Sequence, residues 1–407
     1  GARRAARDGM NSRIWLMVAS GVAVVLVAGG LRQSFGIFLA PVSLDLEISR
    51  QAFGLVMAVQ AVIFGIFQPV TGWLADRHGG FRIIAAGALL YGLGMWLASL
   101  STGTADFMLS FGLLVGLGLS GATQVVVLGV IGKVVPNERR GIVFGTIIAA
   151  SSLGMFVFVP GVQAMMQSLG WRDSFVVLAL AIALLPLIAI VLRDASAVDA
   201  DGARQTFKDV VAEARGHRGY MLLTAGFYVC GFHVSFIGTH LPAYLTDNDV
   251  SPTAAAYALG LIGLCNVLGA YLFGALGDRF NKKNLLTAIY LARAVLMALM
   301  LVLPINNVTG LLFGAIMGFL WLATVPLTSG IVAQVFGTRN FTMLFGFVFM
   351  SHQFGAFGGA WLGGYIYDVT GSYDLMWVIS VVLAVMAAML HLPIDDRPLV
   401  RPVPVSA

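Results

Sequence analysis

The chain has 407 residues, of which 59% are hydrophobic and only 11% are charged. A soluble domain carries about a quarter of its residues as charged groups, so this composition excludes a water-soluble globular protein and predicts a chain embedded in a lipid bilayer. The net charge of +5 does not indicate a nucleic-acid partner, because the basic residues are distributed among short loops between apolar stretches.

Apolar stretches of about 20 residues follow one another along the chain, and each is long enough to cross about 30 Å of hydrocarbon as a helix. The first set is predicted over residues 14–41, 52–75, 83–102, 106–132, 142–167 and 174–192. The second set is predicted over residues 219–245, 253–276, 285–303, 309–335, 341–367 and 374–393. The sequence therefore predicts an all-α membrane protein with twelve transmembrane helices in two six-helix bundles.

The longest polar interval, residues 193–218, separates the two sets of helices. We therefore expect an N-terminal bundle over residues 1–192, a cytoplasmic linker over 193–218, and a C-terminal bundle with a short tail over 219–407. If the N-terminus is placed inside, 20 of the 24 Lys and Arg residues fall on the inner side. Positive residues stay inside, so the sequence predicts a multi-pass protein of the inner (plasma) membrane with both termini cytoplasmic.

The two halves can be superposed with an offset of 201 or 202 residues, as expected for an internal repeat. The segment Gly72–Arg77 falls on Gly274–Arg279, so Asp76 falls on Asp278, and Arg32 falls on His233. Many matches in register with coincident loops are not expected by chance in a glycine-rich chain. The halves are therefore predicted to be pseudo-symmetric.

The turn after the second helix carries the pattern Gly-x-x-x-Asp-Arg-x-Gly followed by a basic residue, with a degenerate copy in the second half. Over essentially its whole length the sequence resembles the major facilitator superfamily, of which this pattern is the hallmark. The resemblance implies two bundles that rock about a central site by alternating access. It also implies a cytoplasmic gating contact at the Asp-Arg pairs of the two copies, which are Asp76, Arg77, Asp278 and Arg279.

None of the 19 Asp and Glu residues lies in the middle of a predicted helix, whereas Arg32 lies slightly past the midpoint of the first. Carriers that exchange cationic drugs for protons need a buried carboxylate, so cationic drug efflux is disfavoured. A guanidinium is costly to bury but binds a carboxylate in a bidentate manner, so Arg32 is predicted to bind an anionic substrate. The alternative is an arginine that reaches the headgroups or bonds helix carbonyls.

His233 superposes on Arg32 in the seventh helix, so the two side chains are expected to approach one central volume from opposite bundles. Histidine changes charge near neutral pH, which makes His233 a candidate for substrate binding and for proton coupling; the alternative is a satisfied core group. Further substrate-binding candidates are polar or amphipathic residues within helices: Gln124, Trp321, His352 and Gln353. Arg293, in the ninth helix, is interpreted as structural.

The run Leu31–Pro41 resembles the first helix of the monocarboxylate porter and oxalate–formate antiporter branches of the superfamily. That resemblance implies that basic and aromatic groups hold a small carboxylate, often together with a proton. Members of those branches also place an arginine in helix 8, where this chain has Asn266 and Ala270 nearby. The basic role is therefore expected to rest on Arg32 or Arg293.

These observations favour a secondary transporter of a small organic anion, a monocarboxylate, with or without proton symport. The alternatives are an exporter of neutral or amphipathic compounds and a transporter-like sensor without flux. An enzyme is not expected, because no nucleotide-binding motif, metal-spaced His/Cys cluster or buried carboxylate pair is present in the sequence. We expect no cofactor and no nucleic acid, a monomer, and partners limited to an anionic small molecule, protons and lipid.

Overall fold

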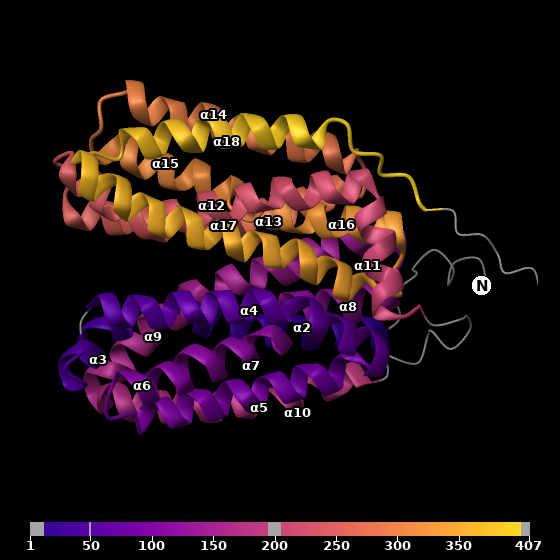
Figure 1. Ribbon diagram of the computed structural model, residues 1–407, viewed down its shortest axis with the longest axis horizontal. Coiled ribbons are helices and arrows are strands. Elements are labelled where there is room, and N and C mark those ends of the chain that lie inside the picture. Colours follow the sequence, from indigo (N-terminus) through magenta and orange to yellow (C-terminus); the bar gives the residue numbers. More distant parts are fainter. Residues whose placement is uncertain (1–11, 49, 194–204, 400–407) are drawn as a thin grey trace, which may run out of the picture.

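The computed structural model describes residues 12–48, 50–193 and 205–399, and within these ranges the regular structure is helical. The N-terminal half comprises α2 (Ser12–Gln33), α3 (Leu39–Asp45), α4 (Arg50–His78), α5 (Gly80–Ser99), α6 (Thr104–Phe107), α7 (Val115–Gly121), α8 (Gln124–Val134), α9 (Arg140–Ala183) and α10 (Leu185–Ala189). The C-terminal half comprises α12 (Arg218–Asp247), α13 (Pro252–Gly277), α14 (Lys282–Val302), α15 (Asn307–Leu320), α16 (Thr324–Phe336), α17 (Phe341–Thr370) and α18 (Asp374–His391). Figure 1 shows the halves as two adjacent bundles, with α11 (Phe207–Gly216) at one end.

By length and composition, eleven helical stretches of the described residues could cross a membrane. The remaining predicted span, residues 341–367, corresponds to α17, which has 30 residues but is not among the eleven. Its central Ser351-His352-Gln353 and its glycines lower its hydropathy, and α17 packs between α12 and α4. The architecture is therefore the predicted all-α arrangement, with one helix that is more polar at its centre.

Small residues allow helices within each half to pack closely, as in other membrane bundles. In the N-terminal half, a Cβ on Gly30 of α2 would overlap the backbone of Gly154 in α9. In the C-terminal half, a Cβ on Gly231 of α12 would overlap the carbonyl group of His352 in α17. The glycines thus set the separation of these helices.

Several predicted spans are less regular than the sequence indicated. The first helix stops at Gln33 and continues as a 3-10 turn, Phe35–Phe38, and α3. The fourth is a chain of α6, the π-helical Met108–Leu114, α7 and α8, because the glycines and Thr123 of this region form helix poorly. The fifth and sixth both fall in α9, which kinks at Gly170, a residue with non-helical φ of 79° and ψ of 171°.

The linker contains a helix that the polar interval 193–218 did not reveal, and residues 194–204 of that interval lie outside the described ranges. Thr206 caps α11 by accepting a hydrogen bond from the Asp209 amide. The ring of Phe207 lies 5.8 Å from that of Trp73 in α4 and 6.3 Å from that of Phe347 in α17. The first turn of α11 therefore contacts both halves.

We call the side of the molecule that carries α11 and the α4–α5 and α8–α9 turns the linker side. Here the halves meet along two helix pairs, α4 with α17 and α9 with α13. A Cβ on Gly145 of α9 would overlap the Ala270 carbonyl of α13, and one on Gly346 of α17 would overlap the Gln68 backbone of α4. The halves are thus closed against each other on the linker side.

Candidate substrate site and gate

Two helices are interrupted at the centre of the molecule, and polar side chains bond the backbone at each interruption. Between α7 and α8, Gln68 Nε2 donates to the Ser120 carbonyl (2.9 Å) and Thr123 Oγ1 donates to Gln68 Oε1 (3.3 Å). Thr71 Oγ1 also donates to the Ser120 carbonyl (2.8 Å). Free backbone groups at membrane depth need such partners, so these residues stabilise the break.

Arg293 performs the corresponding task between α15 and α16. Its Nη2 donates to the Leu320 carbonyl (2.8 Å) and to the Trp321 carbonyl, and the side chain is completely buried. The Leu322 amide donates to Asn266 Oδ1 (2.8 Å), and Asn266 Nδ2 donates to Ser152 Oγ of the other half (2.5 Å). The interpretation of Arg293 as structural agrees with this geometry.

Arg32 is half-buried near the end of α2, and its guanidinium carbon lies 4.9 Å from the ring centroid of Phe64 in α4. This cation–π contact is favourable but fills no hydrogen-bond position of the guanidinium. Among the described residues, no hydrogen bond or ion pair to Arg32 is found. Arg293 also keeps Nε and Nη1 without a partner, but its side chain is completely buried and its Nη2 bonds backbone carbonyls. Arg32 differs in that it is half-buried and none of its nitrogens bonds a described residue.

Tyr91 of α5 lies beside Arg32 and was not expected in the site. Its side chain is completely buried, its hydroxyl oxygen has no hydrogen-bond partner, and it interacts electrostatically with Arg32. The repeat contained a signal for this residue, because Tyr91 superposes on Arg293. In each half, the residue at the helix-1 position approaches the residue at the helix-3 position: Arg32 approaches Tyr91, and His233 approaches Arg293.

Aromatic side chains connect Arg32 to the other half. The ring of Phe64 lies 5.1 Å from that of Phe349 in α17, which in turn stacks on His352 at 5.5 Å. Both His352 and Gln353 are buried, and His352 Nε2 and Gln353 Nε2 have no hydrogen-bond partner. The structure therefore places these two candidates at the interface between the halves, where Phe349 lies between Phe64 and His352.

His233 lies inside the C-terminal half rather than beside Arg32. Its Nε2 is 2.9 Å from the Ser380 carbonyl of α18, to which it donates, and its Nδ1 has no partner. It is 1% exposed and interacts electrostatically with Arg293. His233 therefore lies in the interior of the C-terminal half, next to a positive neighbour and with one ring nitrogen unpaired.

The two remaining candidates lie at the helix interruptions and are half-buried. Gln124 is the first residue of α8, and Trp321 is the C-cap residue of α15. The Trp321 indole lies near Gly238, an exposed residue of α12. Both residues therefore adjoin the points at which the helix path changes.

The two predicted gating aspartates each cap a helix of the opposite half. Asp76, at the end of α4, accepts hydrogen bonds from Thr342 Oγ1 (2.7 Å) and the Met343 amide (2.9 Å) in the first turn of α17. Asp278, after α13, accepts from the amides of Gly141 (2.7 Å) and Ile142 (2.8 Å) in the first turn of α9. Carboxylates are stabilised at helix N-termini, so these contacts hold the halves together on the linker side.

Burial raises the pKa of Asp278 above its usual range, and its two amide donors oppose this shift. Asp76 has an additional partner within its own half, Lys133, whose Nζ lies 3.4 Å from Oδ1. The neighbouring arginines are exposed. Arg77 lies over the Trp73 ring at 5.3 Å, and among the described residues no cross-bundle contact of Arg77 or Arg279 is found.

Comparisons with known proteins agree with this architecture. A family model described as "Major Facilitator Superfamily" matches residues 21–323 and 230–407. An uncharacterised MFS-type transporter of Bacillus subtilis, YcxA, is 24% identical, over 94% of this chain and 96% of its own. Monocarboxylate transporter 13 of Rattus norvegicus is 24% identical, over 90% and 85% of the two chains, and that of Bos taurus is 26% identical, also over 90% and 85%.

Solved structures show the same fold. The E. coli fucose:proton symporter FucP superposes with a TM-score of 0.71 at 16% identity, covering 94% of this chain and 98% of its own. FucP in the outward conformation gives a TM-score of 0.70 with the same coverage. Together with the twofold helical architecture and the family match over nearly the whole length, these likenesses show that the chain belongs to the major facilitator superfamily of membrane transporters.

Proposed function

We propose that the protein transports a small organic anion, a monocarboxylate, by alternating access, and that Arg32 binds its carboxylate. The observation that carries the proposal is the state of Arg32: a half-buried guanidinium within the membrane, supported by an aromatic ring and without an anionic partner among the described residues. A permanent charge in this position is costly unless a ligand offsets it. A carboxylate matches the fork of donors that Arg32 presents.

The surroundings of Arg32 support a small and partly apolar anion. Phe64 lies on one side of the guanidinium, and Tyr91 contributes a hydroxyl group whose hydrogen-bonding capacity is unused. A carboxylate held by Arg32 can accept a second hydrogen bond from Tyr91. The distant similarity to monocarboxylate transporters of rat and cattle supports the same substrate class.

We further propose that His233 couples transport to a proton. In its neutral form, Nε2 donates to the Ser380 carbonyl and Nδ1 keeps a free lone pair. The lone pair of Nδ1 takes up the proton when the transporter is loaded with the anion. Anion and proton then cross together, and the charge of the loaded protein stays balanced.

The proposal is tested by uptake of radiolabelled acetate, lactate and benzoate into proteoliposomes, with and without an inward proton gradient. Arg32→Gln is expected to reduce uptake at least tenfold, since a charge-assisted hydrogen bond contributes about 1.5–3 kcal/mol. Arg32→Lys is expected to retain part of it, because it keeps the charge but not the fork. Arg215→Gln, on the exposed face of α11, is the matched control. Normal carboxylate uptake by folded Arg32→Gln would refute the site.

Proton coupling has a separate test. His233→Gln is expected to retain downhill carboxylate exchange but to lose stimulation by an inward proton gradient. If His233→Gln is stimulated as strongly as the wild type, His233 does not carry the proton.

A further inference from the structure

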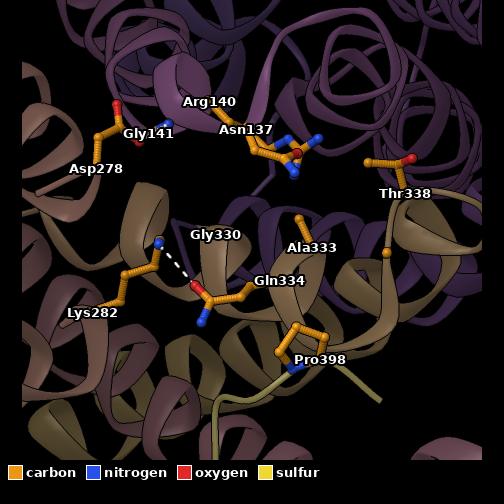
Figure 2. Close-up of a pocket in the computed structure, with 11 residues that line it drawn as sticks. Asn137, Arg140, Gly141, Asp278, Lys282, Gly330, Ala333, Gln334, Thr338 and Pro398 are labelled. Carbon is orange, nitrogen blue, oxygen red and sulfur yellow. Dashed lines mark hydrogen bonds between the residues drawn. The ribbon is translucent and has the colours of Figure 1, made fainter. Parts of the chain in front are cut away.

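A second pocket lies on the linker side, between the halves and distinct from the surroundings of Arg32. It encloses about 660 Å³, within the range of roughly 300–1,000 Å³ that is typical of small-molecule sites. Figure 2 shows Arg140 and Asn137 of the N-terminal half facing Lys282 and Gln334 of the C-terminal half across it. The pocket therefore has walls from both halves.

Two cations from opposite halves line the pocket. Arg140 Nη2 donates to the Gly132 carbonyl (3.0 Å), but Arg140 Nε is buried without a partner. Lys282 Nζ donates to Gln334 Oε1 (3.0 Å), which uses one of the three hydrogens of its ammonium group. Both cations thus keep hydrogen-bond donors for a ligand.

The acidic residue in the wall does not cancel this charge. Both oxygens of Asp278 accept backbone amides of α9, and among the lining residues its one carboxylate faces two cations. Glu138 and Asp396 also interact electrostatically with Arg140 and Lys282, respectively, but neither lines the pocket. Figure 2 shows Asn137 beside Arg140, and Thr338 of the C-terminal half adds a second neutral polar group to the lining. The lining therefore offers a net positive charge and donors from several directions, which suits a tetrahedral oxyanion better than a planar one.

We propose that this pocket binds a phosphate-bearing anion and that its occupancy holds the two halves closed on the linker side. Arg140 and Lys282 bind the phosphate from opposite halves, as an arginine fork and a lysine point charge do in other phosphate sites. The remaining volume receives the group to which the phosphate is attached. The source is either a soluble phosphorylated compound or the headgroup of an anionic lipid.

Binding is coupled to conformation because the wall includes the Asp278 contacts that join the halves. When the halves separate on the linker side, Arg140 and Lys282 move apart and the site is lost. A ligand that binds only the closed state lowers the population of the open state in proportion to its occupancy. At a concentration ten times its Kd, it reduces that population about tenfold. The positive-inside distribution predicts that this side is cytoplasmic, so the anion acts from within the cell.

The test measures binding to the purified full-length protein at constant ionic strength, with chloride as the balancing anion. Inorganic phosphate and glycerol 3-phosphate are the soluble probes, and Kd is obtained from thermal-shift titrations in detergent. Phosphatidylglycerol is compared with phosphatidylcholine in nanodiscs as the lipid probe. The variants are Arg140→Gln and Lys282→Gln, with Arg140→Lys to keep the charge without the fork. The exposed neighbours Arg139→Gln and Lys208→Gln are controls.

We expect the wild type and both controls to bind with the same Kd. For Arg140→Gln and Lys282→Gln we expect Kd to rise at least about tenfold. Soluble probes that stabilise the wild type selectively identify a free anion, whereas selective stabilisation by phosphatidylglycerol identifies a lipid headgroup. If neither source distinguishes the wild type from Arg140→Gln and Lys282→Gln, the proposal is wrong. Melting temperatures without ligand identify a variant that fails to fold. In that case the Kd of Arg140→Lys, which keeps the charge but not the fork, is compared with that of the wild type. The measurement involves no carboxylate substrate and is independent of Arg32.

Discussion

Arg32 and Arg293 are two arginines within apolar helices, and their surroundings differ. The guanidinium of Arg293 bonds the carbonyls that the break between α15 and α16 leaves free, so its charge is used within the fold. The guanidinium of Arg32 faces the Phe64 ring and the unpaired Tyr91 hydroxyl. Arg293 therefore stabilises the break between α15 and α16, whereas Arg32 has no hydrogen-bond partner among the described residues.

Tyr91→Phe separates a substrate contact from a structural one. A buried hydroxyl without a partner does not stabilise the fold, so its removal is expected to leave the melting temperature unchanged or slightly raised. If Tyr91 donates to the substrate, KM for carboxylate uptake rises roughly five- to tenfold. Uptake kinetics and thermal unfolding of the same preparation provide the two measurements. Unchanged KM together with a lower melting temperature would show that the hydroxyl serves the fold alone.

The site was only partly predictable at this scale. Arg32 could be singled out as a candidate because a charged residue within an apolar helix is costly and therefore conspicuous. Tyr91 could not, because tyrosine is common in membrane helices, and only the approach of α5 to α2 brings it to Arg32. His233 was predicted to share a volume with Arg32, but its ring nitrogen bonds the Ser380 carbonyl, and a backbone partner leaves no trace in the sequence.

At the scale of helices, the closed side depends on pairs of helices that approach without side chains between them. A Cβ on Gly72 would fall inside the van der Waals radius of the Thr342 carbonyl of α17. Gly72→Ala is therefore expected to separate α4 from α17 and to increase the population that is open on the linker side. Modification of a cysteine introduced at that interface measures the opening.

Gly161→Ala in α9 is the matched control for this change, because a Cβ there meets no atom within 4 Å. It replaces a glycine within a helix by alanine, so a stabilisation of up to about 1 kcal/mol is expected. Equal opening in both variants would mean that helix propensity, rather than the close approach of α4 and α17, controls the gate.

The cross-bundle contact of Asp278 predicts a pH dependence of the gate. Burial raises the pKa of Asp278 in the closed state, and separation of the halves returns it toward its usual value of about 3.9. The closed state thus binds the proton more tightly, so closure is favoured as the pH falls through the raised pKa, and opening is favoured as the pH rises.

Energy transfer between labels on the α4–α5 and α13–α14 turns, measured between about pH 4 and pH 7, monitors this equilibrium. Asp278→Asn is expected to reduce its slope, because the amide does not titrate. If the pH dependence of opening is as steep in Asp278→Asn as in the wild type, groups other than Asp278 cause it.

The type and number of helices were predictable because long apolar segments admit few alternatives in a bilayer. The interruptions in the fourth and tenth helices were not. Ser120 and Leu320 lie in apolar sequence, and the helix ends there because Gln68 and Arg293, distant in the chain, bond the carbonyls that are released. Similarly, α11 is a short amphipathic helix that is stabilised by its capping box and by contacts with the bundles.

At the scale of the whole molecule, α11 joins two bundles that move relative to each other in the proposed alternating-access cycle. Phe207 packs between Trp73 and Phe347, so its contacts are lost when the halves separate on the linker side. Phe207→Ala is expected to accelerate opening and to lower the closed population several-fold, because it removes apolar burial from the closed state only. Lys208→Ala, on an exposed position of the same helix, is the control. Energy transfer between the same labels measures the closed population of both variants. Equal closed populations in Phe207→Ala and Lys208→Ala would exclude a role for Phe207.

The unpaired guanidinium of Arg32 has an electrical consequence for the whole cycle. With a carboxylate bound, the pair is neutral and its passage across the membrane moves no net charge. Without the anion, the returning protein carries a positive charge through the membrane field, which acts with about 2.3 kcal/mol per charge for each 100 mV fully crossed. Net transport of the anion without a proton should therefore move charge in the return step. Proton-coupled transport, in which protonated His233 adds one positive charge to the loaded protein, and exchange of one anion for another should both move no net charge.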